Sequence, residues 1–156
     1  MKLFYLFILI LLLPLIAINA AQSVEWKSDS YLLLPYNFPW KIYDLDPPWY
    51  SAMAQSKALP LLIYAYNMTG LEKYRETAEG ILNSFFIEVS DGGITYKTDK
   101  SGWWYELYAK NDSKHPKVLN GMLWALVALD EYFKATNDTK AKFLFDQGIK
   151  SLQENL

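Results

Sequence analysis

The feature of this sequence that most constrains its fold is a helical pattern that occurs twice, 67 residues apart. The first copy covers Ser51–Tyr66 and ends at Thr69-Gly70, and the second ends at Thr136-Asn137. When the chain is shifted by this amount, apolar residues coincide: Ala58-Leu59 with Ala125-Leu126, Leu62 with Leu129, and Tyr66 with Phe133. Such a repeat is typical of αα-hairpins, which stack into solenoids or close into toroids. Because one hairpin cannot bury its own apolar face, we expect two of them to form an incomplete array.

Apolar spacing predicts four helices in two pairs, at residues 51–66, 71–88, 118–136 and 138–154. Pro60 should bend or restart the first helix. Between the pairs, the alternation over Ile94–Thr98 followed by Lys100-Ser101-Gly102 predicts a short β-hairpin. The expected fold class is therefore all-α, with αα-hairpin repeats forming part of an (α/α) toroid and a short β-hairpin insertion.

The composition limits the chemistry that this chain can perform. It has no cysteine and one histidine, which excludes disulfides, thiolate zinc sites and a cysteine nucleophile, and argues against a histidine-based metal centre. With 17 acidic and 15 basic side chains, the chain lacks the excess of positive charge that is typical of nucleic-acid-binding proteins. Catalysis would then depend on carboxylates, hydroxyls, amides, lysines or tyrosines. The aromatic share of 17% suits stacking on sugars as well as core packing.

The amino-terminal sequence indicates export. Lys2 precedes an apolar run from Leu3 to Ile18, and small residues follow at Ala20 and Ala21, so we interpret residues 1–21 as a signal peptide or a membrane anchor. The location would then be secreted or membrane-anchored, on the extracytoplasmic side. Residues 22–48, rich in proline and aromatic residues, should form an extended segment over a surface. Residues 49–156 should form the helical domain.

Three Asn-x-Ser/Thr sequons agree with export. They begin at Asn67, Asn111 and Asn137, and we expect all three in turns, where an exported chain could be glycosylated.

The densest polar and aromatic cluster is Trp103–Tyr108, with Asn120 following at the start of a helix. In an extended segment Glu106 and Tyr108 would point to the same side, so that a carboxylate and a phenol converge on one cleft. A tyrosine base needs nearby positive charge or a hydrogen-bond network to lower its pKa. The alternative is structural, with the aromatic residues capping the bundle and Glu106 in solvent.

A second cluster lies at Trp49–Gln55. Ser51 is placed to cap the following helix, and Gln55 lies one turn further on the same face, where its amide could bind sugar hydroxyls or carboxylates. A capping serine and a solvent-facing glutamine are the simpler alternative. His115, in a polar loop, is more typical of a surface residue than of a catalytic one.

These motifs resemble a known family. The run Trp49-Tyr50-Ser51-Ala52-Met53-Ala54-Gln55, the later Trp104-Tyr105-Glu106-Leu107-Tyr108, and Val118-Leu119-Asn120-Gly121 are similar in order and spacing to the C-terminal helical domain of D-glucuronyl C5-epimerases. The resemblance covers about residues 36–140 and implies an (α/α) toroid. It also implies an isomerase that converts D-glucuronate to L-iduronate in heparan or heparosan chains by C5 proton abstraction and reprotonation, without a cofactor.

The resemblance also implies roles for individual residues. Tyr108 matches an active-site tyrosine, with Glu106 as a catalytic partner. Asn120 would line the same cleft, and Lys110 is a candidate cation for the substrate carboxylate. The other residues expected to bind substrate are Trp104, Tyr105, Ser51 and Gln55.

Two departures from the family pattern leave other functions open. The family usually has a second glutamate immediately before the tyrosine, where this chain has Leu107. The family's remaining catalytic tyrosines and a substrate-binding arginine lie further along the toroid, so a second copy or another chain is expected to complete it. The alternatives are a non-catalytic glycan-binding or assembly module and a uronate lyase of toroid fold.

Overall fold

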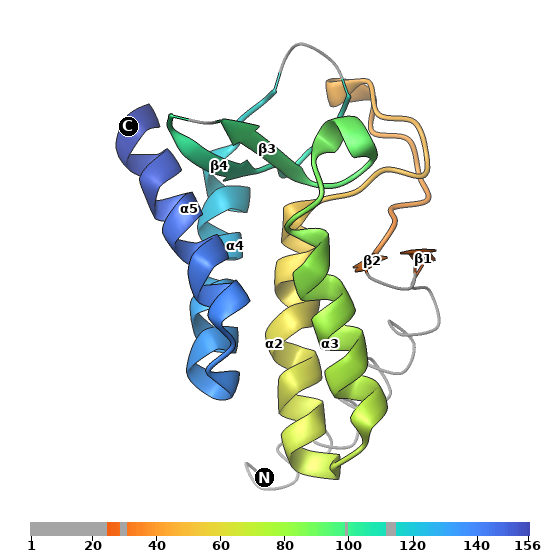
Figure 1. The fold of residues 1–156 in the computed structure, drawn as a ribbon. Coiled ribbons are helices and arrows are strands. Elements are labelled where there is room, and N and C mark those ends of the chain that lie inside the picture. The colour runs from red at the N-terminus through yellow and green to blue at the C-terminus, as the bar shows by residue number, and fades with distance from the viewer. Residues whose placement is uncertain (1–24, 29–30, 99, 112–114) are drawn as a thin grey trace, which may run out of the picture.

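The computed structural model describes residues 25–28, 31–98, 100–111 and 115–156 and is mostly helical. The long helices stand roughly upright in Figure 1, with a β-hairpin across their upper ends. The elements in chain order are β1 (Glu25–Ser28), β2 (Tyr31–Leu33), the 3-10 turn η1 (Lys41–Tyr43), α2 (Ala52–Thr69), α3 (Glu72–Ser84), the 3-10 turn η2 (Val89–Asp91), β3 (Thr95–Thr98), β4 (Gly102–Tyr105), α4 (Leu119–Thr136) and α5 (Thr139–Asn155).

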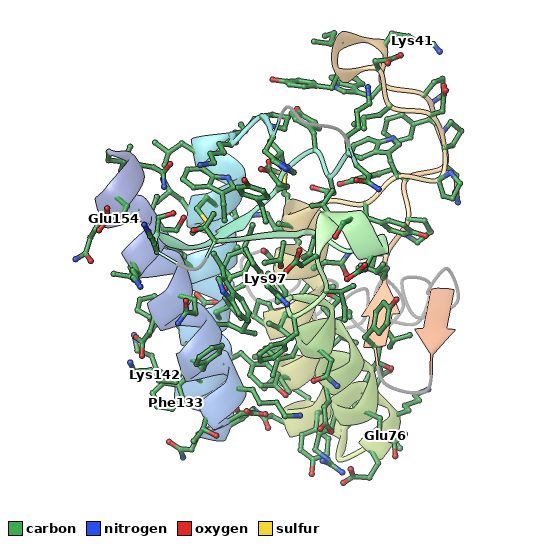
Figure 2. All side chains as sticks on the ribbon, turned by 45° about the horizontal axis from the view of Figure 1, so that its top comes forward. Lys41, Glu76, Lys97, Phe133, Lys142 and Glu154 are labelled. Carbon is green, nitrogen blue, oxygen red and sulfur yellow. The ribbon has the colours of Figure 1, made fainter. Side chains whose placement is uncertain are left out.

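The helices divide into an inner and an outer pair. α2 packs against α4, while α3 packs on α2 and α5 packs on α4. α3 and α5 are amphipathic, and their charged residues, such as Glu76 and Lys142, lie at the periphery in Figure 2. α2 and α4 are apolar around more of their circumference, which is typical of helices that are contacted from several sides. The core therefore forms around α2 and α4.

The two inner helices end in the same way. Gly70 after α2 and Asn137 after α4 both adopt the left-handed conformation, with φ of 67° and 57°. Each donates its backbone N–H to a carbonyl four residues earlier, on Tyr66 and Phe133 respectively, over 2.7 Å. Glycine and asparagine are the residues that accept this conformation most readily. The hairpin turns predicted at these positions are confirmed.

Two details of the predicted helices are corrected by the structure. α2 does not restart at Pro60 but continues through it, since proline removes a single backbone hydrogen bond and α2 is packed between α3 and α4. α3 ends at Ser84 rather than at residue 88, because Phe85 is fully buried and the chain turns there so that Ile87 can accept the Thr95 N–H.

The predicted β-hairpin is present as β3 and β4, which pair antiparallel with Thr95 opposite Tyr105. It packs closely on α5 at Gly102, whose φ is 71° and where a Cβ atom would lie 2.3 Å from the Gln147 carbonyl oxygen. The hairpin is therefore held against α5, and its second strand, β4, leads directly into the segment that precedes α4.

The Pro-rich segment folds back on itself through two antiparallel β-bridges. Backbone hydrogen bonds join Tyr36 to Trp49 in both directions, and Trp40 to Leu45 in both directions. The turn between these arms is η1, followed by Asp44 in the left-handed conformation. The result is a closed loop, which we name the 36–49 loop, at the upper end of the helices.

The predicted leader, residues 1–21, lies outside the described residues. Within the part of the chain that the structure describes, no helix combines the length and apolar character needed to cross a membrane. Asn111 and Asn137 lie in a bend and at a helix end as predicted, whereas Asn67 lies in the last turn of α2; all three are exposed.

Candidate functional site

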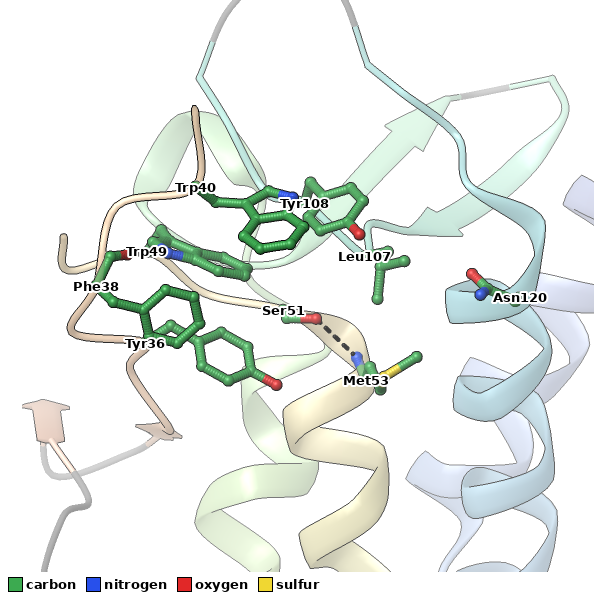
Figure 3. A pocket seen from close by; sticks show the side chains of 9 residues that line it. All are labelled: Tyr36, Phe38, Trp40, Trp49, Ser51, Met53, Leu107, Tyr108 and Asn120. Atoms are coloured by element: carbon green, nitrogen blue, oxygen red, sulfur yellow. Dashed lines mark hydrogen bonds between the residues drawn. The ribbon is translucent and has the colours of Figure 1, made fainter. Parts of the chain in front are cut away.

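A pocket of about 240 Å³ opens where the 36–49 loop meets the amino-terminal ends of α2 and α4. The segment after β4 closes its upper side, as Figure 3 shows. Segments far apart in the sequence therefore meet at this one place. The pocket is lined by Tyr36, Phe38, Trp40, Trp49, Ser51, Met53, Leu107, Tyr108 and Asn120.

The pocket wall is a continuous group of aromatic rings. Trp49 is its centre, with ring centroids 4.3 Å from Tyr36, 5.7 Å from Phe38 and 6.0 Å from Tyr108. Tyr108 in turn stacks on Tyr43 with centroids 4.0 Å apart. The Trp49 indole donates a hydrogen bond of 2.8 Å to the Phe38 carbonyl oxygen, which fixes the loop against its own wall. Flat rings with polar edges suit the apolar faces of sugars.

The polar groups of the pocket come from helix starts and from two tyrosines. Ser51 is the N-cap of α2, and its Oγ accepts the Met53 N–H over 3.1 Å, as predicted for a capping serine. Asn120 lies in the first turn of α4 and is exposed at the pocket edge. Burial, and the proximity of Tyr108, raise the pKa of the Tyr36 phenol. Tyr36 therefore stays protonated at neutral pH and acts as a hydrogen-bond donor.

The nine lining residues carry no carboxylate and no cation. The carboxylate that was expected beside Tyr108 is Glu106, and the structure separates the two. The chain bends at Leu107 and Tyr108 instead of staying extended, so Leu107 and Tyr108 line the pocket while Glu106 turns inward and is fully buried. The prediction that Glu106 and Tyr108 point to the same side is therefore wrong, and so is the alternative that Glu106 lies in solvent.

Glu106 lies behind the pocket wall in an apolar setting. Its Oε2 accepts the backbone N–H of Lys117 over 3.2 Å, and burial raises the pKa of its carboxyl to about 7. Its backbone carbonyl accepts the Ala52 N–H over 2.9 Å. Glu106 thus connects the start of α2 to the residues before α4.

Three of the predicted substrate-binding residues are part of the core. Tyr105 is fully buried, and its hydroxyl donates a 2.6 Å hydrogen bond to the Leu144 carbonyl. Trp104 is almost fully buried. Gln55 is also buried rather than facing solvent, and its amide donates to the Leu34 carbonyl over 3.5 Å, which ties the chain after β2 to α2. All three lie in the core and none is among the residues that line the pocket.

Lys110 and His115 also lie outside the lining residues. Lys110 forms an ion pair with Asp44 over 2.9 Å on the outer side of the 36–49 loop. The His115 ring stacks on Tyr96, with centroids 3.7 Å apart. Of the residues predicted to form the site, the structure brings Ser51, Tyr108 and Asn120 together.

Sequence reasoning missed the aromatic residues of the 36–49 loop as site residues. Tyr36, Phe38 and Trp40 alternate with other residues, and successive side chains of an extended segment point to opposite sides. Their spacing of two residues could therefore have predicted from the sequence that the three rings lie on the same side of the segment.

Comparison with known proteins gives consistent matches. The family described as D-glucuronyl C5-epimerase C-terminus matches residues 28–156. An uncharacterized protein of Methanocaldococcus jannaschii is 32% identical over 135 residues, which cover 84% of this chain and 43% of that protein. A D-glucuronyl C5-epimerase of Caenorhabditis elegans is 33% identical over 125 residues, or 72% of this chain and 20% of that protein. The chain spans less than half the length of either relative.

Proposed function

Because the chain belongs to the D-glucuronyl C5-epimerase C-terminal family, we propose that it acts on a glucuronate-containing polysaccharide of the heparosan or heparan type. The proposed reaction is epimerisation of D-glucuronate to L-iduronate. The observation that supports it best is the position of Tyr108 in the wall of an aromatic pocket, where its ring stacks on Tyr43 of the 36–49 loop and Asn120 lines the same pocket from α4.

In this proposal Tyr108 faces the hydrogen at C5 of a bound glucuronate. Ionised Tyr108 takes this proton as the C5–H bond breaks, the electron pair of that bond delocalises into the adjacent carboxylate, and a second group donates a proton to the opposite face of C5. Tyr36 lines the same pocket from a different segment and is held protonated, so it is our candidate for the returning proton. Ser51 and Asn120 provide hydrogen-bonding groups for sugar hydroxyls.

A second candidate function, glycan binding without proton transfer, is favoured by Leu107. Leu107 occupies the position at which the family usually has a glutamate, and it lines the pocket next to Tyr108. The uncharged lining of the pocket offers no cation to stabilise a phenolate. Stacking and hydrogen bonding to a sugar would be unaffected by either feature.

The experiment is incubation of the folded protein with a glucuronate polymer in deuterated water, with deuterium at C5 read by NMR. Epimerisation predicts exchange that Tyr108→Phe abolishes while sugar affinity stays within about threefold, since one hydroxyl contact is lost. Exchange with an unsaturated product would instead indicate a uronate lyase. Binding without exchange would establish the glycan-binding function, and neither binding nor exchange would reject both.

We also propose that the protein is secreted or membrane-anchored and glycosylated. The apolar run from Leu3 to Ile18 and the exposure of Asn67, Asn111 and Asn137 support this proposal. A shift in mass after glycosidase treatment of the natural protein would test it.

The two helical hairpins are proposed to form part of an (α/α) toroid, completed by a second copy of the chain. The shared hairpin turn geometry at Gly70 and Asn137 supports the repeat, and the apolar outer face of α4 supports its completion by further helices.

A further inference from the structure

We propose that Lys57 and Trp124 form a second saccharide subsite, next to the aromatic pocket, that binds the carboxylate of a uronate residue. This inference rests on the proposed function, because it assigns the charged group of the polymer to a place on the protein. The two residues come from the inner helices, Lys57 from α2 and Trp124 from α4.

The geometry of the pair is specific. The Lys57 ammonium lies over the Trp124 ring, 2.8 Å from its centroid. Both residues are exposed, and 44% of the Trp124 surface is open to solvent although indole rings are usually well covered. A cation held over the face of an indole is stabilised by the ring quadrupole. The positive charge therefore has a preferred position instead of moving freely on a flexible side chain.

The pair continues the pocket along the helices. Lys57 lies four residues after Met53, and Trp124 lies four residues after Asn120, and both Met53 and Asn120 line the pocket. Four residues are about one helical turn, or roughly 6 Å along the axis, on the same helix face. A polymer chain that leaves the pocket along the helices therefore passes over Trp124 and Lys57. In a chain that alternates uronate and hexosamine, the carboxylate that meets Lys57 belongs to the uronate beyond the hexosamine next to the pocket.

The charge distribution selects an acidic sugar for this position. The pocket lining contains no cation, so a carboxylate would gain no ionic partner there. Lys110, the other nearby lysine, is already paired with Asp44. Among the ion pairs that the described residues form, none involves Lys57. Trp124 is a positioning residue in this arrangement, and Lys57 makes the contact with the carboxylate.

The test is calorimetric titration of the full chain with a glucuronate-containing oligosaccharide and with a neutral N-acetylglucosamine oligomer. We expect Lys57→Gln to weaken binding of the acidic oligosaccharide about fivefold at low salt and to leave the neutral oligomer within twofold. The difference in affinity for the acidic oligosaccharide between the unmodified chain and Lys57→Gln should shrink at about 0.5 M salt, since an exposed ion pair is screened. Trp124→Leu should weaken the acidic ligand about threefold, because the ammonium loses its fixed position.

Lys73→Gln is the matched control. Lys73 is another exposed lysine with its ammonium near an aromatic ring, 5.1 Å from the Tyr74 centroid, but it lies on the outer helix α3. The Lys73→Gln variant should bind both oligosaccharides as tightly as the unmodified chain does. Equal losses for the Lys57 and Lys73 variants, or no loss for Lys57→Gln, would overturn the subsite while leaving the proposed function intact. Failure of the unmodified chain to bind the acidic oligosaccharide would overturn both.

Discussion

Glu106 and Lys117 are joined by a buried hydrogen bond, in which the Lys117 backbone N–H donates to the Glu106 carboxylate oxygen Oε2 over 3.2 Å. The other carboxylate oxygen, Oε1, is buried without a hydrogen-bond partner among the described residues. A buried carboxylate with one weak contact favours the protonated form, which explains the direction of its pKa shift. The contact supports the pocket from behind, since Glu106 precedes Leu107 and Tyr108.

The pKa of Glu106 predicts that stability depends on pH. Burial raises that pKa from 4.5 to about 7 in the folded chain. Between these pH values the folded state keeps a proton that the unfolded state has lost, so the free energy of unfolding falls as pH rises. The loss should reach up to about 3 kcal/mol by pH 7 and then level off. Urea denaturation at pH 4.5, 6 and 8 measures it.

Glu106→Gln should remove most of this dependence, because an amide can accept the Lys117 N–H and carries no charge to desolvate. The control is Glu154→Gln, which removes an exposed carboxyl at the end of α5 and should leave the pH profile unchanged. A Glu106→Gln protein whose stability still falls between pH 4.5 and 7 would show that another group is responsible.

Leu107→Glu should raise C5 proton exchange. Leu107 lines the pocket beside Tyr108, so the substitution places a carboxylate where the pocket has none. General acid–base catalysis typically contributes a factor of 10² or more, and we expect at least a tenfold rise in deuterium incorporation. Leu107 is 6% exposed, so a stability cost of about 1–3 kcal/mol should accompany the gain.

The matched variant for this experiment is Leu107→Gln, which has a similar shape and no basic group. It should bind sugar as the glutamate variant does but show no faster exchange. If both variants exchange at the rate of the unmodified chain, a base at residue 107 is not what limits proton transfer.

Much of the fold could be predicted from local sequence signals. The helix ends at Gly70 and Asn137 and the cap at Ser51 depend on residues close in sequence, and the structure agrees with them. The end of α3 could not be predicted in this way, because it depends on the burial of Phe85 against Tyr105, whose ring centroids lie 5.3 Å apart. That contact joins residues far apart in the chain.

The site was predicted less well for the same reason. Ser51, Tyr108 and Asn120 were identified from motifs, and the structure places them around one pocket. The directions of Glu106 and Gln55 were not predictable from strand or helix spacing, because a bend at Leu107 and a long-range hydrogen bond to Leu34 decide them. Residue spacing predicts on which side of a helix or strand a side chain lies, whereas its burial depends on which other segments pack against that side.

The outer face of α4 predicts self-association. Leu119, Leu123 and Val127 follow one another at intervals of four residues and are each 39–48% exposed, although α4 is already buried on its other side. A second copy of the chain with the same face would cover this stripe through a two-fold interface. Light scattering after size exclusion should give a dimer mass for the unmodified chain and a monomer mass for Leu123→Lys, with unchanged helical circular dichroism. The control Met68→Lys alters an exposed apolar residue near the end of α2 and should remain dimeric. A monomeric unmodified chain would refute the proposed pairing.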